Sequence, residues 1–90
     1  MLQGVLEKHG VDKQVERFGV LELWPEIVGS ELARVTRAKG VDEAALFVEV
    51  RSSAWLTELS MMKDQFLERV NERLEDTEIE RIVFVLAETT

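Results

Sequence analysis

The sequence predicts an α+β protein of two layers, with helices packed on one face of a three-stranded sheet. Apolar residues recur at helical spacing in two separate parts of the chain, residues 2–35 and 53–74. Three other stretches, residues 36–41, 45–51 and 79–86, are strand-like and rich in apolar and β-branched residues. The expected order is therefore helix, helix, strand, strand, helix, helix, strand.

The composition limits the class of protein. A length of 90 residues predicts a single domain spanning residues 1–90, and a hydrophobic content of 46% predicts a real core. Cysteine is absent and His9 is the only histidine, so we expect no disulfide, no metal site and no cofactor. No apolar run is long enough to span a membrane, and the first residues do not resemble a signal peptide, so we expect a cytoplasmic protein.

The first part of the chain predicts two helices before residue 24. Residues 2–8 are expected to form a short helix that ends at Gly10, because glycine commonly follows a helix. Residues 12–23 are expected to form the next helix. Val15 and Phe18 are spaced to lie on its inward face, joined by Leu21 or Leu23.

The stretch ELWPEIVGSEL, residues 22–32, places a proline inside a helical pattern. Pro25 lacks an N–H and is favoured as the first residue of a helix, so we expect the chain to restart there. Trp24 would then close the junction in the core, with Trp55 packed near it. Gly29 would allow a neighbouring element to approach closely.

The middle of the chain predicts a hairpin with a tight turn at residues 42–44. Side chains alternate along its second strand, so one face carries Leu46, Val48 and Val50, and the other carries Phe47, Glu49 and Arg51.

A second pair of helices is predicted after the hairpin. Ser52 or Ser53 can cap the first of them, whose first turn carries Trp55, and Ser60 can cap the next. The inward side of that next helix follows a spacing of four residues, at Met62, Phe66, Val70 and Leu74. The closing strand, residues 79–86, can join the hairpin by a crossover connection.

A candidate binding surface follows from the expected sheet. If Leu46, Val48 and Val50 face the helices, the opposite face is mixed apolar and basic. Its candidate nucleic-acid-binding or partner-binding residues are Arg37, Lys39, Phe47, Arg51 and Arg81. Solvent or other parts of the chain would cover such a face in the plainest case. The alternatives are a dimer interface, a contact with a partner protein or a weak nucleic-acid platform.

The charges argue against a protein that grips nucleic acid non-specifically, because the net charge is −7. They are nevertheless uneven, since residues 34–51 carry four basic and three acidic residues. No nucleophile–base pair, glycine-rich phosphate loop or metal-ligand spacing stands out, so the sequence predicts no enzymatic activity.

Two blocks carry a family resemblance: LWPEIVG, residues 23–29, and VEVRSSAWLTELSMMK, residues 48–63. In this order they resemble the bacterial DciA family, and the likeness runs from Leu2 to Leu86. The residues that carry it are Trp24, Pro25, Gly29, Ser53 and Trp55. The resemblance implies a fold like a type II KH domain. It also implies a role with the replicative helicase DnaB, as an operator or loader, and DNA binding by some members.

The resemblance leads to our first functional prediction, a non-enzymatic DNA-replication adaptor that binds DnaB and favours its loading. KH domains clamp a nucleic-acid backbone with a Gly-x-x-Gly loop, whereas residues 59–62 here read Leu-Ser-Met-Met. Two alternatives stay open. One is a KH-like module that binds single-stranded DNA or RNA weakly through the basic sheet face, and the other is a dimerisation domain. The sequence does not decide the oligomeric state.

Overall fold

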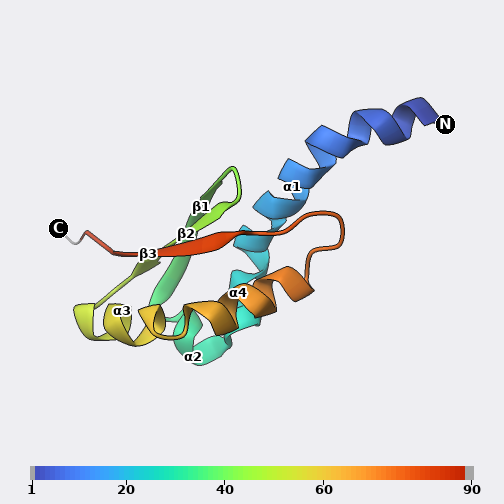
Figure 1. Cartoon of the computed structure of the whole chain (residues 1–90). Coiled ribbons are helices and arrows are strands. Elements are labelled where there is room, and N and C mark those ends of the chain that lie inside the picture. Colours follow the sequence, from blue (N-terminus) through green and yellow to red (C-terminus); the bar gives the residue numbers. More distant parts are fainter. Residues whose placement is uncertain (1, 89–90) are drawn as a thin grey trace.

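The computed structural model describes the backbone of residues 2–88 and the side chains of residues 14–88. It is an α+β domain with the predicted order of elements (Figure 1). The elements are α1 (Leu2–Val28), α2 (Ser30–Ala33), β1 (Thr36–Asp42), β2 (Ala45–Val50), α3 (Ser53–Ser60), α4 (Lys63–Glu72) and β3 (Arg81–Leu86).

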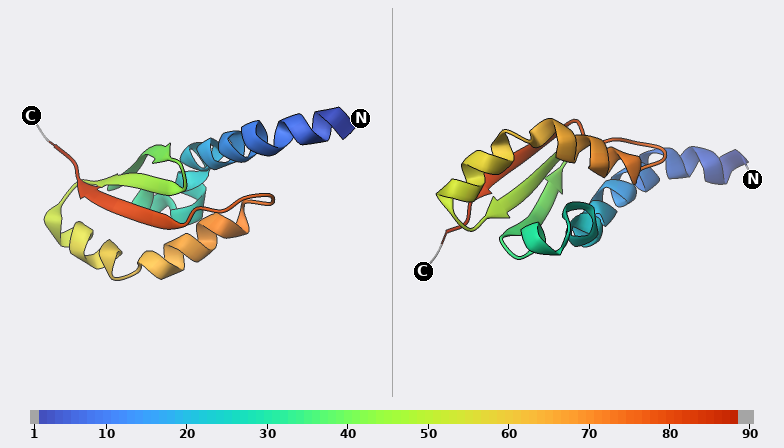
Figure 2. Two further views of the ribbon diagram at one scale, coloured as in Figure 1. Left: turned by 45° about the horizontal axis from the view of Figure 1, so that its top comes forward. Right: turned by 90° about the horizontal axis from the view of Figure 1, so that it is seen from below.

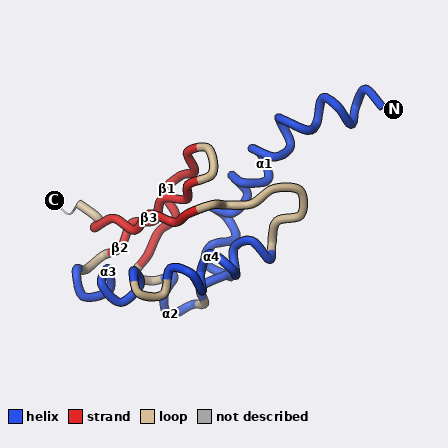
Figure 3. The backbone as a smooth tube through the Cα atoms, viewed as in Figure 1, coloured by secondary structure: helices blue, strands red, loops and turns tan. Residues whose placement is uncertain are grey.

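The sheet is mixed, with the strand order β1-β2-β3. β1 and β2 form an antiparallel hairpin, and β3 runs parallel to β2. A parallel pair needs a crossover connection, and α3 and α4 supply it between β2 and β3 (Figure 3). The helices pack on one side of the sheet, which leaves its other side as an outer face (Figure 2).

The core lies between the sheet and the helices. Leu46, Val48 and Val50 of β2 are fully buried there, as the alternation along this strand predicts. The helices and the segment before β3 contribute Val20, Trp24, Ile27, Val28, Leu59, Phe66, Val70 and Ile79. The rings of Trp24, Phe66 and Phe84 form a cluster with centroids 6.1–6.5 Å apart. Aromatic rings at such distances stabilise a core beyond the area they bury.

Helix α1 is longer than predicted and corrects two expectations, the helix end at Gly10 and the new start at Pro25. It runs without interruption from Leu2 to Val28, so neither Gly10 nor Pro25 ends it. Ending and restarting a helix would leave unpaired N–H and C=O groups at each new terminus, whereas an interior glycine costs only about 1 kcal/mol. Pro25 is accommodated in the last turn, where the Gly29 amide still donates to the Pro25 carbonyl at 3.0 Å.

The true break in the chain is at Gly29. Its backbone has φ 93° and ψ 160°, a combination open almost only to glycine. A Cβ atom added there would meet nothing within 4 Å, so the prediction that Gly29 permits close approach is wrong. The residue is needed for its backbone conformation, which turns the chain from α1 into the single turn of α2.

The predicted inward face of α1 is wrong at Val15 and Phe18, which are 61% and 45% exposed, whereas Leu21 and Leu23 are partly buried against the core as expected. The buried face follows Val20 and Trp24 instead. About one helical turn before Val20, α1 contacts the loop before β3 rather than the apolar core. There Glu16 accepts hydrogen bonds from the amides of residues 75 and 76, and Arg17 donates to the carbonyl of residue 78. In this part of α1, the residues that contact the rest of the chain are therefore Glu16 and Arg17, rather than the apolar Val15 and Phe18.

Of the two serines proposed to cap α3, Ser52 is the cap, since its Oγ accepts from the Trp55 amide at 3.2 Å. Ser53 is the first residue of the helix. The predicted cap at Ser60 is wrong, because Ser60 is the last residue of α3 and α4 begins after Met62 without a side-chain cap.

Asn71, near the end of α4, positions the chain before β3. Its amide nitrogen donates to the Ile79 carbonyl at 3.0 Å, and its amide oxygen accepts from the Ile79 N–H at 2.7 Å. Ile79 is thereby held in the core two residues ahead of β3, so the strand begins at Arg81 rather than at residue 79.

Candidate interaction surface

The outer face of the sheet is formed by the residues of β1, β2 and β3 that point away from the helices. Phe47 lies at its centre, with Gly40 of β1 and Val83 of β3 as its cross-strand partners. Because glycine has no side chain, a shallow hollow of about 410 Å³ opens beside the ring, and Val85 and Lys39 also line it. A half-buried aromatic ring in an open hollow suits contact with another flat or apolar group.

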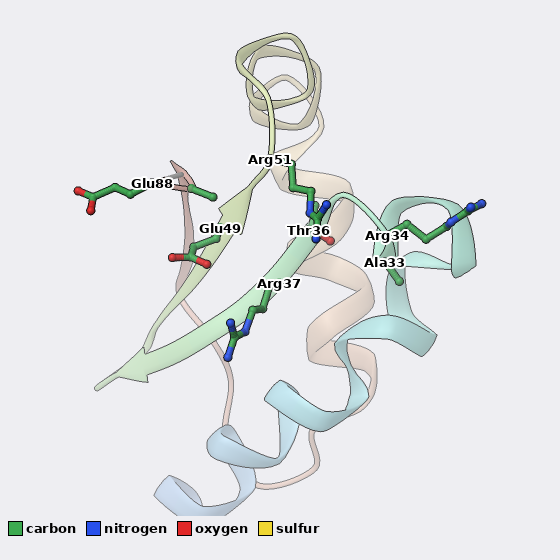
Figure 4. Close-up of a pocket in the computed structure, with 8 residues that line it drawn as sticks. Ala33, Arg34, Thr36, Arg37, Glu49, Arg51 and Glu88 are labelled. Atoms are coloured by element: carbon green, nitrogen blue, oxygen red, sulfur yellow. The ribbon is translucent and has the colours of Figure 1, made fainter. Parts of the chain in front are cut away.

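A larger groove of about 720 Å³ lies at the end of the sheet where β2 ends and β1 begins (Figure 4). We call it the arginine groove, after Arg34, Arg37 and Arg51. Its other lining residues are Ala33, Thr36, Glu49, Ala87 and Glu88.

The three arginines reach the groove from different elements. Arg34 follows α2, Arg37 belongs to β1, and Arg51 follows β2, where its amide donates to the Val35 carbonyl at 3.0 Å. Figure 4 shows the Arg34 side chain pointing away from Arg37 and Arg51. Within residues 14–88, the ion pairs are Lys39–Glu49 and Arg73–Glu26, so none of the three arginines takes part in one.

Lys39 lies on the outer face because of a β-bulge. The register of β1 against β2 shifts between Ala38 and Gly40, which leaves Lys39 as the extra residue. Its Nζ atom lies 3.0 Å from Glu49 Oε2, and Glu49 also lines the arginine groove. The pair lies at the surface, with Lys39 exposed and Glu49 partly buried, so it contributes little to stability but offsets the negative charge that Glu49 brings to the groove.

The structure divides the candidate residues chosen from the sequence. Arg37 and Arg51 share the arginine groove, with Lys39 and Phe47 next to it. Arg81 pairs with Ala45 at the far end of β2. Because a strand rises ~3.3 Å per residue, this position lies about 20 Å from Arg51. Arg34 was missed, because only the turn after α2 brings it to the groove. Its place in the basic segment of residues 34–51 was the available signal.

The two tryptophans of the family blocks have different environments. Trp24 is only 2% exposed, and its Nε1 donates to Thr36 Oγ1 at 2.9 Å. Trp55 is 38% exposed on α3, so the expectation that it packs near Trp24 is wrong. The aromatic neighbours of Trp24 are Phe66 and Phe84.

The turn between α3 and α4 lies where the family resemblance would place a KH clamp, but its Met61 and Met62 amides are already hydrogen-bonded. Met61 N–H donates to the Thr57 carbonyl at 3.3 Å, and Met62 N–H donates to the Leu59 carbonyl at 3.0 Å. Asp64 adds a negative charge in the first turn of α4, where a phosphate would approach. This turn is therefore poorly suited to hold a nucleic-acid backbone.

The described part of the chain lacks two further features, a cluster of metal ligands and a membrane-spanning helix. Residues 14–88 contain no group of three or more His, Cys, Asp or Glu side chains that could hold a metal ion. Among the helices that the structure describes, none has both the length and the apolar character needed to cross a membrane.

The fold and the outer face define the class of protein, a small two-layer α+β domain with one sheet face free of helices. A family model described as "Dna[CI] antecedent, DciA" matches residues 1–84. The chain therefore belongs to the DciA family.

Curated relatives are named UPF0232 proteins. The protein of Corynebacterium glutamicum strain R is 31% identical over 74 residues, which cover 82% of this chain and 42% of the relative. That of Streptomyces avermitilis is 36% identical over 72 residues, or 78% of this chain and 40% of the relative. A Streptomyces coelicolor protein is 40% identical over 58 residues, covering 62% and 30%. The chain thus spans about two fifths of the length of the first two relatives.

Proposed function

We propose that this chain is a non-enzymatic interaction domain of DNA replication that binds the replicative helicase DnaB and promotes its loading. The observation that carries the proposal is the family match over residues 1–84, whose description relates the family to DnaC and DnaI. Such a role places the protein in the bacterial cytoplasm. As a non-enzymatic adaptor, the purified chain should hydrolyse ATP only at background rate when no helicase is present.

The arginine groove is the surface that we assign to the helicase contact. Guanidinium groups form forked hydrogen bonds with carboxylates, so Arg37 and Arg51 suit acidic side chains of a partner protein. The rest of the chain is strongly acidic, because residues outside 34–51 hold fifteen of the eighteen acidic side chains. The groove, with three arginines against Glu49 and Glu88, carries a net positive charge that suits an acidic partner.

Charge reversal in the groove tests this assignment. Arg51→Glu should weaken binding of the cognate helicase by about tenfold or more, because it replaces an attractive contact by a like-charge contact. Lys63→Glu is the matched control, since it makes the same charge change at an exposed position on α4. Binding of labelled protein to purified helicase gives the affinities, and circular dichroism checks the fold.

The result separates the assignment from a general effect of charge. Loss of affinity with Arg51→Glu alone supports the groove as the helicase contact. Equal losses with both variants would mean that only net charge matters, and unchanged affinity with both would remove the groove from the contact. Failure of the unaltered chain to bind helicase or to increase its loading on forked DNA would contradict the function itself.

A second candidate function is weak binding of single-stranded DNA, and the position of Phe47 favours it. The ring lies on the outer face beside the arginine groove, as in proteins that stack bases on a sheet and hold phosphates with cations. Phe47→Leu keeps an apolar side chain but removes the stacking ring, so it should lower DNA affinity by about tenfold. Unchanged DNA affinity in a titration with labelled single strands would reject this function.

A further inference from the structure

β3 is an edge strand that pairs only with β2 in the described structure. The Arg81 amide donates to the Ala44 carbonyl at 3.4 Å, and the Ala87 amide donates to the Val50 carbonyl at 2.7 Å. Successive residues of a strand direct their backbone groups alternately to the two sides. The odd-numbered residues of β3 therefore bond to β2, and the N–H and C=O groups of Ile82, Phe84 and Leu86 point away from the sheet.

The two edges of the sheet differ in how they are protected. β1 carries a bulge at Lys39 and exposed cations, features that hinder pairing with another strand. β3 reads RIVFVL and has no bulge, proline or lysine. Leu86 at its end is 48% exposed, and α3, which carries the half-exposed Trp55, packs against β3. The β3 edge is regular, apolar and open to a further strand.

The charges at this edge indicate what kind of strand fits. Acidic residues precede and follow β3, and Arg81 is the one basic residue between them. These acidic residues are Glu75, Asp76, Glu78, Glu80 and Glu88. A second copy paired antiparallel about Phe84 would place Glu80 opposite Glu88 at both ends, which is unfavourable. A segment with basic ends would instead pair with opposite charges.

We propose that the β3 edge binds an extended segment of another protein, with alternating apolar residues and a lysine or arginine at each end. The segment adds a fourth strand and bonds to the outward N–H and C=O groups of Ile82, Phe84 and Leu86. This site adjoins the arginine groove at Glu88, which lines that groove, but the proposal does not depend on the groove being the helicase contact.

A synthetic peptide tests the proposal on the whole chain. The probe is Lys-Val-Thr-Val-Thr-Val-Lys, and the control replaces both lysines by glutamate. Amide hydrogen exchange followed by NMR should show faster exchange at residues 82, 84 and 86 than at 83 and 85 in the free protein. The basic peptide should slow exchange at these three amides by about tenfold, and the acidic peptide should not.

A pair of variants at Leu86 isolates the backbone. Leu86→Pro removes an outward N–H without removing a hydrogen bond to β2. Its affinity for the basic peptide should therefore be about tenfold lower than that of Leu86→Ala. If Leu86→Pro fails to fold, the exchange pattern of the unaltered chain still decides. Slow exchange at all β3 amides in the free protein, or no protection by the basic peptide, would overturn the proposal. Protection that rises with protein concentration without peptide would identify a second copy as the occupant and also overturn it.

Discussion

Trp24 joins three elements through one buried polar atom. Its Nε1 donates to Thr36 Oγ1, and that hydroxyl donates in turn to the Leu32 carbonyl at 2.7 Å. The indole ring itself packs against Phe66 and Phe84. α1, α2 and β1 are therefore linked by a short chain of hydrogen bonds inside an otherwise apolar core. Buried polar groups in such a place stabilise the fold only when each has a partner.

Thr36→Val tests this chain of hydrogen bonds. Valine has nearly the same shape but no hydroxyl, so Trp24 Nε1 would be buried without an acceptor. We expect the free energy of unfolding to fall by about 1–3 kcal/mol. Urea denaturation measures the change, and Thr36→Ser, which keeps the hydroxyl, should lose less. Equal stability of the valine variant and the unaltered chain would show that the hydrogen bond adds nothing.

Trp24→Ala tests the packing of the same residue. Removing a buried ring leaves a cavity beside Phe66 and Phe84, so unfolding should become easier by roughly 3–5 kcal/mol. Trp24→Phe should cost less, because most of the volume remains filled. The midpoint of chemical denaturation reports both values. A midpoint that does not move on Trp24→Ala would contradict the burial of this side chain.

At the scale of the elements, two glycines of the first helical region have opposite roles. Gly29 has a positive φ of 93° where α1 ends, whereas Gly19 lies inside α1, and neither has a neighbour within 4 Å of an added Cβ atom. A substitution at either position therefore changes backbone energy without steric overlap.

We expect Gly29→Ala to destabilise the chain by about 1–3 kcal/mol, because alanine is strained at this φ and ψ. Gly19→Ala is the matched control and should stabilise it by about 0.5–1 kcal/mol, because alanine is the better helix former. Thermal or urea denaturation of the two variants shows whether each is less or more stable than the unaltered chain. Destabilisation by Gly19→Ala, or stability gained on Gly29→Ala, would contradict the continuous helix and the break after it.

At the scale of the whole molecule, the uneven charge limits how nucleic acid can bind. The net charge is −7, and the cations near Phe47 are confined to one end of the sheet. Few phosphates can therefore be neutralised at once. Arg81 lies too far along the sheet to join Arg37 and Arg51 on a short strand.

For single-stranded DNA we expect a shallow salt dependence. The slope of log affinity against log salt should be about −2 to −4, as for three to five phosphate contacts on a single strand. Titrations at several salt concentrations measure it, and Arg51→Glu should make the slope shallower, whereas Arg81→Glu should change it less. A much steeper slope would show that basic residues elsewhere in the chain also take part.

The sequence by itself determined the α+β class, the order of elements and the family. Alternation in β2 predicted its buried face because side chains of a strand point to two sides in turn, whatever packs on them. The blocks around Trp24 and Trp55 predicted the family, because a family resemblance depends only on which residues stand in the sequence and in what order. In these cases the signal is local and needs no knowledge of distant contacts.

Only the tertiary structure decided the continuity of α1, its buried face and the grouping of the basic residues. Pro25 breaks helices by local preference, but the burial of Trp24 and Ile27 on one face of the same helix favours its continuation. Arg34 and Arg51 line one groove, and Arg81 lies away from both, because strand register and the turn after α2 set these positions. Such contacts join residues far apart in the chain, and local patterns carry no information about them.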